Sequence, residues 1–236
     1  TDSGKYAVRT TTATLTVDKA TPTFTWSSVS ATYGDANAAI TAPTVGGSVA
    51  GSWSYASATN SVVAVSGSSL DFGNVGSSVV TATFTPTDTA NYVSGGTATM
   101  TVTVGQATPT FTWSNVAKTF GDANFALSAP TVAGSVAGSW SYASATTSVI
   151  SISGSTSTVA GAGSSVVTAT FTPTDAANYV SGGTVTMTVT VSQATPTFTW
   201  SNVSKTFGDA NFALSAPTVA GSIAGSWSYA SATTSV

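Results

Sequence analysis

The chain contains no cysteine and no histidine, and all of its acidic residues are aspartates. Without cysteine, disulfide bonds and cysteine-ligated zinc sites are excluded. Without histidine and glutamate, the commonest general bases are missing, and no serine has a histidine partner for nucleophilic catalysis. The sequence therefore predicts a protein that is not an enzyme, with no catalytic residues, no metal site and no cofactor.

Charged side chains are also scarce. They make up 6% of the 236 residues, against about 25% in ordinary soluble domains. The five basic residues are scattered and the net charge is −3, which excludes the clustered basic face that nucleic acid requires. No apolar run approaches the ~18 residues of a transmembrane helix. We therefore expect neither nucleic-acid binding nor membrane insertion in this segment.

What the chain does contain is typical of β-structure. Hydrophobic residues make up 42% of it, which is too much for a disordered linker rich in serine and threonine. Valine, threonine and aromatic residues are plentiful and favour strands, whereas strong helix formers such as glutamate, leucine and glutamine are scarce. The predicted fold class is all-β.

The sequence repeats with a period of 87 residues and no insertions. The motif "ATPTFTW" begins at Ala20, Ala107 and Ala194, and "GDAN" recurs with the same spacing. A unit of this length fits an independent sandwich domain. We predict four parts: the C-terminal strands of a preceding domain (1–19), two complete repeats (20–106 and 107–193), and the N-terminal half of a third (194–236). We therefore expect the chain to be a segment of a longer array of such repeats.

Within each repeat, short stretches alternate between apolar and polar residues. "TFTW" places Phe24 and Trp26 on one face, and "TATMTVTV" alternates threonine with apolar residues from Thr97 onward. Six or seven such strands, separated by glycine and proline, are typical of an Ig-like β-sandwich. The junction "VTVGQATPTF" is short and contains Pro109, which restricts hinge motion. We expect the tandem sandwiches to form an extended rod.

Two motifs contain the candidate structural residues. "GSWSYASAT" pairs Trp53 with Tyr55, and Trp140 with Tyr142 in the next repeat. Such a pair can form a platform for sugar rings or part of a sandwich core, and the alternation favours the core. The second motif, Asp-x-Ala-x-Tyr, occurs in the ranges Asp88–Tyr92 and Asp175–Tyr179. It predicts a tyrosine corner, with the tyrosine at the start of a strand. "DSGKY" near the N-terminus has a similar pattern, with Gly4 in place of the alanine between Asp2 and Tyr6.

Three further features each have a functional and a structural interpretation. The row of threonines at 97, 99, 101 and 103 could order ice or glycan, but outward-facing strand residues are the favoured interpretation. Asp35 and its repeats are better explained as turn caps than as calcium ligands, which need six to eight converging oxygens. Lys118 could form an isopeptide crosslink, but Ala31 occupies its place in the first repeat, so an exposed lysine is favoured.

The motifs "KTFGDANFALSAP", "GSWSYASATTSVISISG", "TVAGAG" and "VTATFTPTDAANYVSG" together resemble tandem bacterial Ig-like (Big-type) repeats. "DSGKYAV" resembles a more general Ig domain. Repeats of the bacterial kind occur in large secreted adhesins and surface proteins, and related modules occur on phage virions. The resemblance implies a structural segment of an extracellular or cell-surface protein, serving as a stalk, spacer or filament-forming module.

The expected partners are the neighbouring domains of the same chain. Few surface charges also favour lateral self-assembly into fibres, with edge strands as the contact. The alternative function is an adhesive module that binds a glycan or a protein, on a cell surface or a phage virion. No residue pattern supports a glycan site directly.

Overall fold

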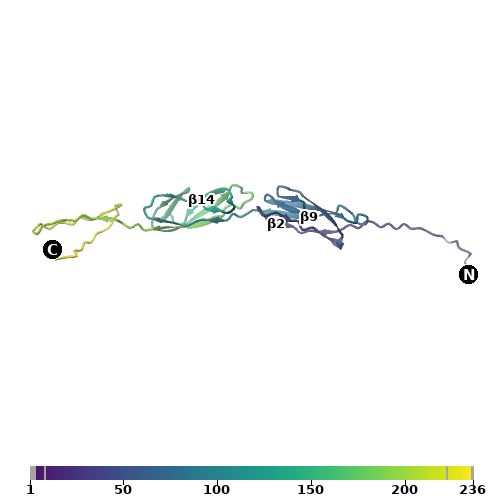
Figure 1. The fold of residues 1–236 in the computed structure, drawn as a ribbon, viewed down its shortest axis with the longest axis horizontal. Coiled ribbons are helices and arrows are strands. Elements are labelled where there is room, and N and C mark those ends of the chain that lie inside the picture. Colours follow the sequence, from purple (N-terminus) through teal and green to yellow (C-terminus); the bar gives the residue numbers. More distant parts are fainter. Residues whose placement is uncertain (1–3, 8, 222, 235–236) are drawn as a thin grey trace. The chain divides into compact units, whose positions relative to one another are not determined.

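The computed structural model describes residues 4–7, 9–221 and 223–234, and it is built from strands and short 3-10 turns (Figure 1). By packing, the chain divides into two compact units. The first contains Thr1–Phe111, Val132–Ser139 and Phe171–Gly183; the second contains Thr112–Thr131, Trp140–Thr170 and Thr184–Val236. We describe the strands repeat by repeat, because each repeat forms its own set of sheets.

The first repeat contains nine strands in three sheets. They are β1 (Phe24–Thr25), β2 (Val29–Thr32), β3 (Ala38–Ala39), β4 (Thr44–Val45), β5 (Gly51–Ser57), β6 (Val63–Ser66), β7 (Ser69–Phe72), β8 (Gly76–Pro86) and β9 (Thr97–Gly105). One sheet has the order β2-β9-β8-β5, the second β3-β7-β6, and β1 pairs with β4. This arrangement confirms the predicted all-β, Ig-like sandwich.

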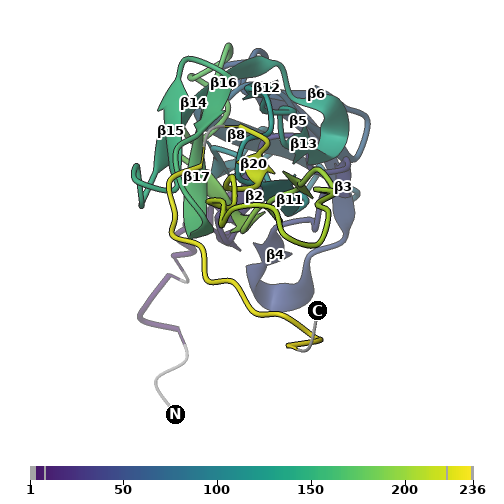
Figure 2. The same ribbon diagram turned by 90° about the vertical axis from the view of Figure 1, so that its left-hand side faces the viewer.

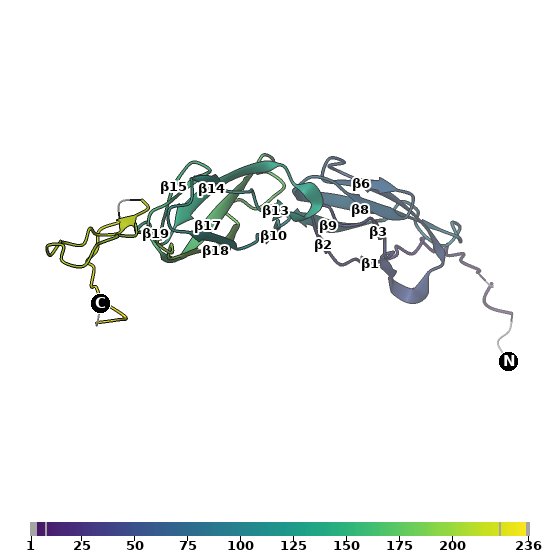
Figure 3. The same ribbon diagram turned by 60° about the vertical axis from the view of Figure 1, so that its left-hand side comes forward.

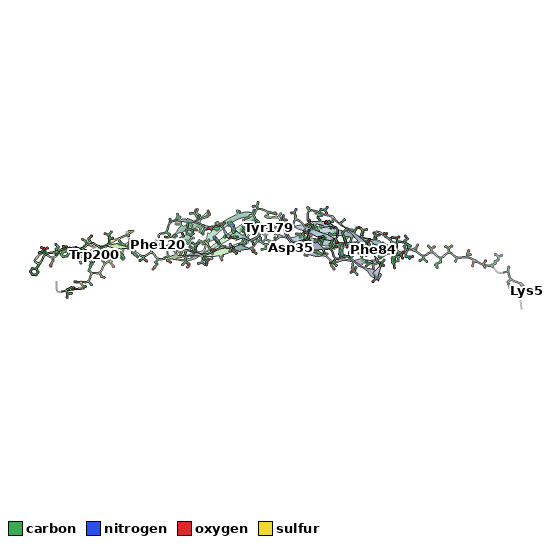
Figure 4. All side chains as sticks on the ribbon, in the orientation of Figure 1. Lys5, Asp35, Phe84, Phe120, Tyr179 and Trp200 are labelled. Atoms are coloured by element: carbon green, nitrogen blue, oxygen red, sulfur yellow. The ribbon has the colours of Figure 1, made fainter. Side chains whose placement is uncertain are left out.

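The sheets form because the alternating residues place one apolar face inward. Along β8, Val80, Ala82 and Phe84 are at most 1% exposed, and Val102 and Val104 of β9 are equally buried. Phe84 lies within the first repeat in the stick view (Figure 4). The strands β8 and β9 are antiparallel neighbours, from Gly76 opposite Val104 to Thr83 opposite Thr97 (Figure 3). The first strand of the sheet, β2, instead runs parallel to β9.

The second repeat has the same strands in the same order. They are β10 (Phe111–Thr112), β11 (Val116–Thr119), β12 (Phe125–Ala126), β13 (Thr131–Val132), β14 (Gly138–Ser144), β15 (Ile150–Ser153), β16 (Thr156–Val159), β17 (Gly163–Pro173) and β18 (Thr184–Ser192). The sheet orders are β11-β18-β17-β14 and β12-β16-β15, with β10 paired to β13. The strands β11 to β17 are labelled in Figure 2. Ile150, Val167 and Val189 are fully buried here.

The segments outside the two repeats are much less ordered into sheets. Residues 194–234, apart from the undescribed residue 222, contain only β19 (Phe198–Thr199) and β20 (Thr218–Val219), which pair with each other. The described residues 4–7 and 9–19 contain no strand, because a strand needs a hydrogen-bonding neighbour to be stable. Asp2, Ser3 and Val8 lie outside the described residues, and the assignment of 1–19 to a preceding domain stays a prediction.

Candidate functional site

The aromatic pair of "GSWSYASAT" lies on β5, at the edge of the four-stranded sheet. Trp53 stands opposite Phe84 of β8, and Tyr55 stands opposite Ala82. Because paired residues share a face, both rings lie on the inner face, with the buried residues of β8. Both are half-buried rather than fully buried.

Ring contacts hold this aromatic pair in place. The ring centroid of Trp53 is 4.8 Å from that of Phe84 and 5.1 Å from that of Phe24. Tyr55 packs on Trp26 at 5.8 Å, and in the second repeat Tyr142 packs on Trp113 at 5.7 Å. Burial raises the pKa of both tyrosines above their usual value. The rings thus belong to the margin of the core and do not form an open, flat platform.

The predicted tyrosine corner is wrong in its position. Tyr92 lies in the loop between the end of β8 at Pro86 and the start of β9 at Thr97, so it begins no strand. Asp88 Oδ1 accepts hydrogen bonds from the backbone N–H groups of Ala90 and Asn91 at 3.1 Å, and its Oδ2 accepts one from Asn91 Nδ2 at 2.8 Å. These bonds from Asn91, more than the nearby Lys19, hold the pKa of Asp88 below its usual value. The motif is therefore an aspartate-closed turn between the last two strands.

The second copy of this turn has additional contacts, all inside the first compact unit. Asp175 again accepts a hydrogen bond from the side chain of Asn178, at 2.8 Å. Asn178 Oδ1 also accepts one from the backbone N–H of Val75 at 2.9 Å, and the ring of Tyr179 meets that of Tyr33 edge-on at 5.3 Å. Asn178 is 8% exposed, whereas Asn91 is exposed. The two turns have the same motif, so no sequence signal distinguished them.

The remaining charged candidates make local contacts. Asp35 Oδ2 accepts a hydrogen bond from the backbone N–H of Thr32 at 2.7 Å, and Asp122 does the same for Thr119 at 2.9 Å. Within the described ranges no three histidine, cysteine, aspartate or glutamate residues are grouped so that they could hold a metal ion. The ammonium of Lys118 lies 4.6 Å from the ring centroid of Phe125. The aspartate contacts are those expected of turn caps, whereas Lys118 is half-buried and not the fully exposed lysine that the sequence favoured.

The outer face of the four-stranded sheet is a lattice of hydroxyl groups wider than the sequence indicated. Two exposed threonines of β9 face threonines of β8, with Thr97 opposite Thr83 and Thr99 opposite Thr81, and a third, Thr103, lies opposite Ser77. Ser52 and Ser54 of β5 extend the same face. Val79, which is 44% exposed, interrupts it, and the normal twist of a sheet rotates each strand against the next. Both features weaken the match to a flat, regular ligand such as ice.

A groove that the sequence did not reveal opens beside Trp26. It has a volume of about 370 Å³ and runs between β1–β2 and β3, with Leu70 and Met100 among its lining residues. Trp26 Nε1 donates a hydrogen bond to the carbonyl of Thr41 across it, at 2.7 Å. An equivalent groove of about 360 Å³ lies beside Trp113. Its lining comes from distant parts of each repeat, which is why no local motif indicated it.

Comparison with known proteins leaves the function to be argued from the chain itself. No family model matches the chain, and no curated protein matches it. Among solved structures, domains 1–6 of the surface layer protein SbsC share 17% identity at a TM-score of 0.29, covering 62% of this chain and 21% of that one. The insect immune protein hemolin shares 13% at 0.36 (73% and 47%), and mouse cadherin-23 EC22–24 shares 14% at 0.30 (73% and 65%). In each case the match spans less than two thirds of the other chain. None of the described residues forms a helix that could cross a membrane.

Proposed function

We propose that this chain is a structural segment of a large extracellular or cell-surface protein, serving as a stalk, spacer or filament-forming module. The observation that supports it best is the parallel pairing of β2 with β9, from Val29 opposite Val102 to Thr32 opposite Gly105. In the second repeat β11 pairs with β18 in the same way. The strand near the entry of each sandwich is thus bonded to the strand at its exit.

This pairing suits a module that bears tension. When the chain is pulled by its ends, force enters at the start of β2 and leaves at the end of β9. Because the strands are parallel, this pulls them in opposite directions along their length. The evenly spaced hydrogen bonds of a parallel ladder then share the load, instead of breaking one after another. The turn at Asp35 and the bond from Tyr33 N–H to Gly105 carbonyl, at 2.9 Å, extend the ladder.

Composition supports the same proposal. Both complete repeats form their sandwich from a sequence that has no histidine, cysteine or glutamate. The aspartates of the turns accept hydrogen bonds that close those turns. A role in which the fold itself is the function requires none of these groups. The extracellular location is part of the proposal, because stalks of this kind extend from surfaces.

Stretching single molecules of the full chain tests the tension-bearing role. We expect two similar unfolding events, each releasing about 300 Å of chain for 87 residues at ~3.4 Å per residue. Tyr33 N–H points to β9, so Ala31 N–H does too, two residues earlier. Ala31→Pro should lower the unfolding force of the first repeat alone.

The matched control is Ser30→Pro, whose N–H points away from β9. Proline is tolerated at such a position on an edge strand, so the force should stay near that of the unchanged chain. The second repeat is an internal reference in every trace. Equal forces for the Ala31→Pro variant and the unchanged chain would contradict a load-bearing β2–β9 pair.

The groove beside Trp26 favours a second candidate function, that of a glycan-binding adhesive module. It combines a half-buried indole with serine and threonine side chains, and it recurs in the second repeat. Screening the full chain on a glycan array tests this candidate. A hit that Trp26→Phe and Trp113→Phe weaken, without change in the circular dichroism spectrum, would support it; no hit would exclude glycan adhesion through these grooves.

A further inference from the structure

The outer edge of β5 carries unpaired backbone groups. Its inner edge is bonded to β8 through alternate residues, as shown by the bonds of Ala50 carbonyl to Thr87 N–H and of Ala58 N–H to Val79 carbonyl, both 2.9 Å. In an antiparallel ladder this alternation has a period of two residues. The N–H and C=O groups of the odd-numbered residues of β5 therefore point away from β8. Among the described strands, none pairs with this side of β5.

This edge lacks the charged residues, prolines and bulges that commonly protect edge strands against pairing. Natural proteins cover long edge strands or interrupt them with lysine, proline or a bulge. The range Gly51–Ser57 spans seven residues, all paired in register with β8, and contains no charged residue and no proline. Trp53 and Tyr55 are half-buried along it. Their remaining exposed area would be covered by another strand.

We propose that β5 and β14 pair edge to edge with the same strands of a second copy of this chain, continuing the four-stranded sheet across two molecules. This deepens the proposed structural role, on which it rests, by naming the lateral partner and the contact. A second copy fits because the edge is uncharged: two identical edges meet without like-charge repulsion, while a charged peptide finds no opposite charge there.

The register of the pair follows from the strand itself. Two antiparallel copies of a seven-residue strand overlap completely only when the central residue, Ser54, lies opposite its counterpart. The outward N–H and C=O groups then face each other, and Trp53 stands across from Tyr55 of the copy. Such cross-strand aromatic pairs stabilise sheets. Every other register leaves part of the edge unpaired.

The second repeat makes the contact multivalent. β14 has the identical sequence, GSWSYAS, and is also the end strand of its sheet. Each chain thus presents two equivalent edges, and β5 can pair with β5 or β14 of the copy in the same register. Two weak contacts on one chain raise the apparent affinity well above that of either alone when both can form.

Cysteine crosslinking tests the register, since the chain has no native cysteine. In a non-hydrogen-bonded antiparallel pair the Cα atoms are about 4.5 Å apart, within the ~4.4–6.8 Å range of disulfides. The full chain carrying Ser54→Cys and Ser141→Cys should form disulfide-linked dimers under mild oxidation. In the control, Ser52→Cys with Ser139→Cys, the thiols of two copies are offset by four residues, about 14 Å at ~3.4 Å per residue, and should stay reduced. Equal dimer yields from both variants, or none from the first, overturn the register.

Charge substitutions test which surface forms the contact between copies. Dimerisation of each variant is measured by sedimentation of the full chain over a range of concentrations. Ser54→Lys with Ser141→Lys places like charges opposite each other and should weaken dimerisation by about tenfold or more. Thr99→Lys with Thr186→Lys adds the same charge to the middle of the outer face and should leave it unchanged. If the Thr99→Lys, Thr186→Lys variant dimerised more weakly than the Ser54→Lys, Ser141→Lys variant, the sheet faces and not the edges would form the contact. A chain that stays monomeric throughout overturns the inference, while the stretching experiment judges the structural role separately.

Discussion

Residues 107–149 and 194–236 have nearly the same sequence but different structures. They differ only at Ala117, which is Ser204 in the second segment, and at Val136, which is Ile223. In the first segment five strands, β10–β14, belong to a complete sandwich; in the second, the described residues 194–221 and 223–234 form only β19 and β20. Comparing the two segments therefore shows which structural features the N-terminal half of a repeat forms by itself. It also shows which features require β17 and β18.

Local features are the same in both segments. The indole of Trp113 donates to Ser128 carbonyl at 2.8 Å, and that of Trp200 donates to Ser215 carbonyl at 2.8 Å. The turn at Asp122 recurs at Asp209, with hydrogen bonds of 2.9 and 3.0 Å. A short two-stranded pair, β10 with β13 or β19 with β20, closes each segment. These features depend on residues close in sequence.

Burial differs, because it depends on distant residues. Leu127 is 6% exposed but Leu214 is 45% exposed, and Phe207 is fully exposed whereas its counterpart Phe120 is 49% exposed. In the complete repeat β17 and β18 provide the buried face, with Val167, Ala169, Phe171 and Val189 at most 1% exposed. The aromatic residues of the N-terminal half are thus a partial core that the C-terminal half completes.

The largest expected effect comes from the matched leucines. Leu127→Ala should destabilise the second repeat by about 2–5 kcal/mol, because it leaves a cavity in a packed core. Leu214→Ala removes the same atoms from an exposed site and should change stability by less than about 0.5 kcal/mol. Hydrogen exchange of the β15–β18 amides measures the first effect without interference from the first repeat, and exchange of the β19 and β20 amides measures the second. Similar losses of protection in the two variants would mean that residues 194–236 pack as tightly as a complete repeat.

A matched pair of glycines gives the next largest effect. A Cβ added at Gly138 would collide with the ring of Phe171 and the carbonyl of Thr172, while one at Gly225 would meet nothing within 4 Å. Gly138→Ala should therefore cost about 1–3 kcal/mol through overpacking, and Gly225→Ala should be close to neutral. Denaturant unfolding followed by tryptophan fluorescence compares the two. Gly51→Ala, which meets Phe84 in the same way, should reproduce the cost in the first repeat; a neutral result there would contradict the steric explanation.

The sequence was sufficient for features with a clear period. The 87-residue spacing has a counterpart in the sheets, because β1–β9 and β10–β18 pair in the same orders. The alternation of "TATMTVTV" predicted the strand that forms β9, since strand side chains alternate between faces. The alternation also placed Trp53 and Tyr55 on the inner face, but not at an edge. Edge position depends on which strands pair, and pairing between distant residues leaves no local pattern.

The tyrosine motif shows how a local resemblance can mislead. "DTANY" matches the spacing of a tyrosine corner, yet Tyr92 lies in the loop between β8 and β9 and starts neither strand. Its aspartate closes the turn through Asn91, a contact that depends only on the spacing of the two residues. The additional contact of Asn178 is made with Val75, which lies 103 residues earlier in the chain. The groove beside Trp26 likewise joins residues from both ends of a repeat.

The smallest expected effect concerns the tyrosines of the two segments. Burial raises the pKa of Tyr142, so the folded chain favours the neutral phenol. The stability that this contributes is complete below the unfolded pKa of about 10 and is lost as pH rises through the higher folded value. Tyr142→Phe should therefore lose less thermal stability between pH 8 and pH 11 than the unchanged chain does. Tyr229→Phe is the control: its ring is 45% exposed, so the drop in melting temperature over the same interval should match that of the unchanged chain. If both variants reduced the alkaline loss equally, the ring of Tyr229 would be as well covered as that of Tyr142, and the contrast between the two segments would not hold at this position.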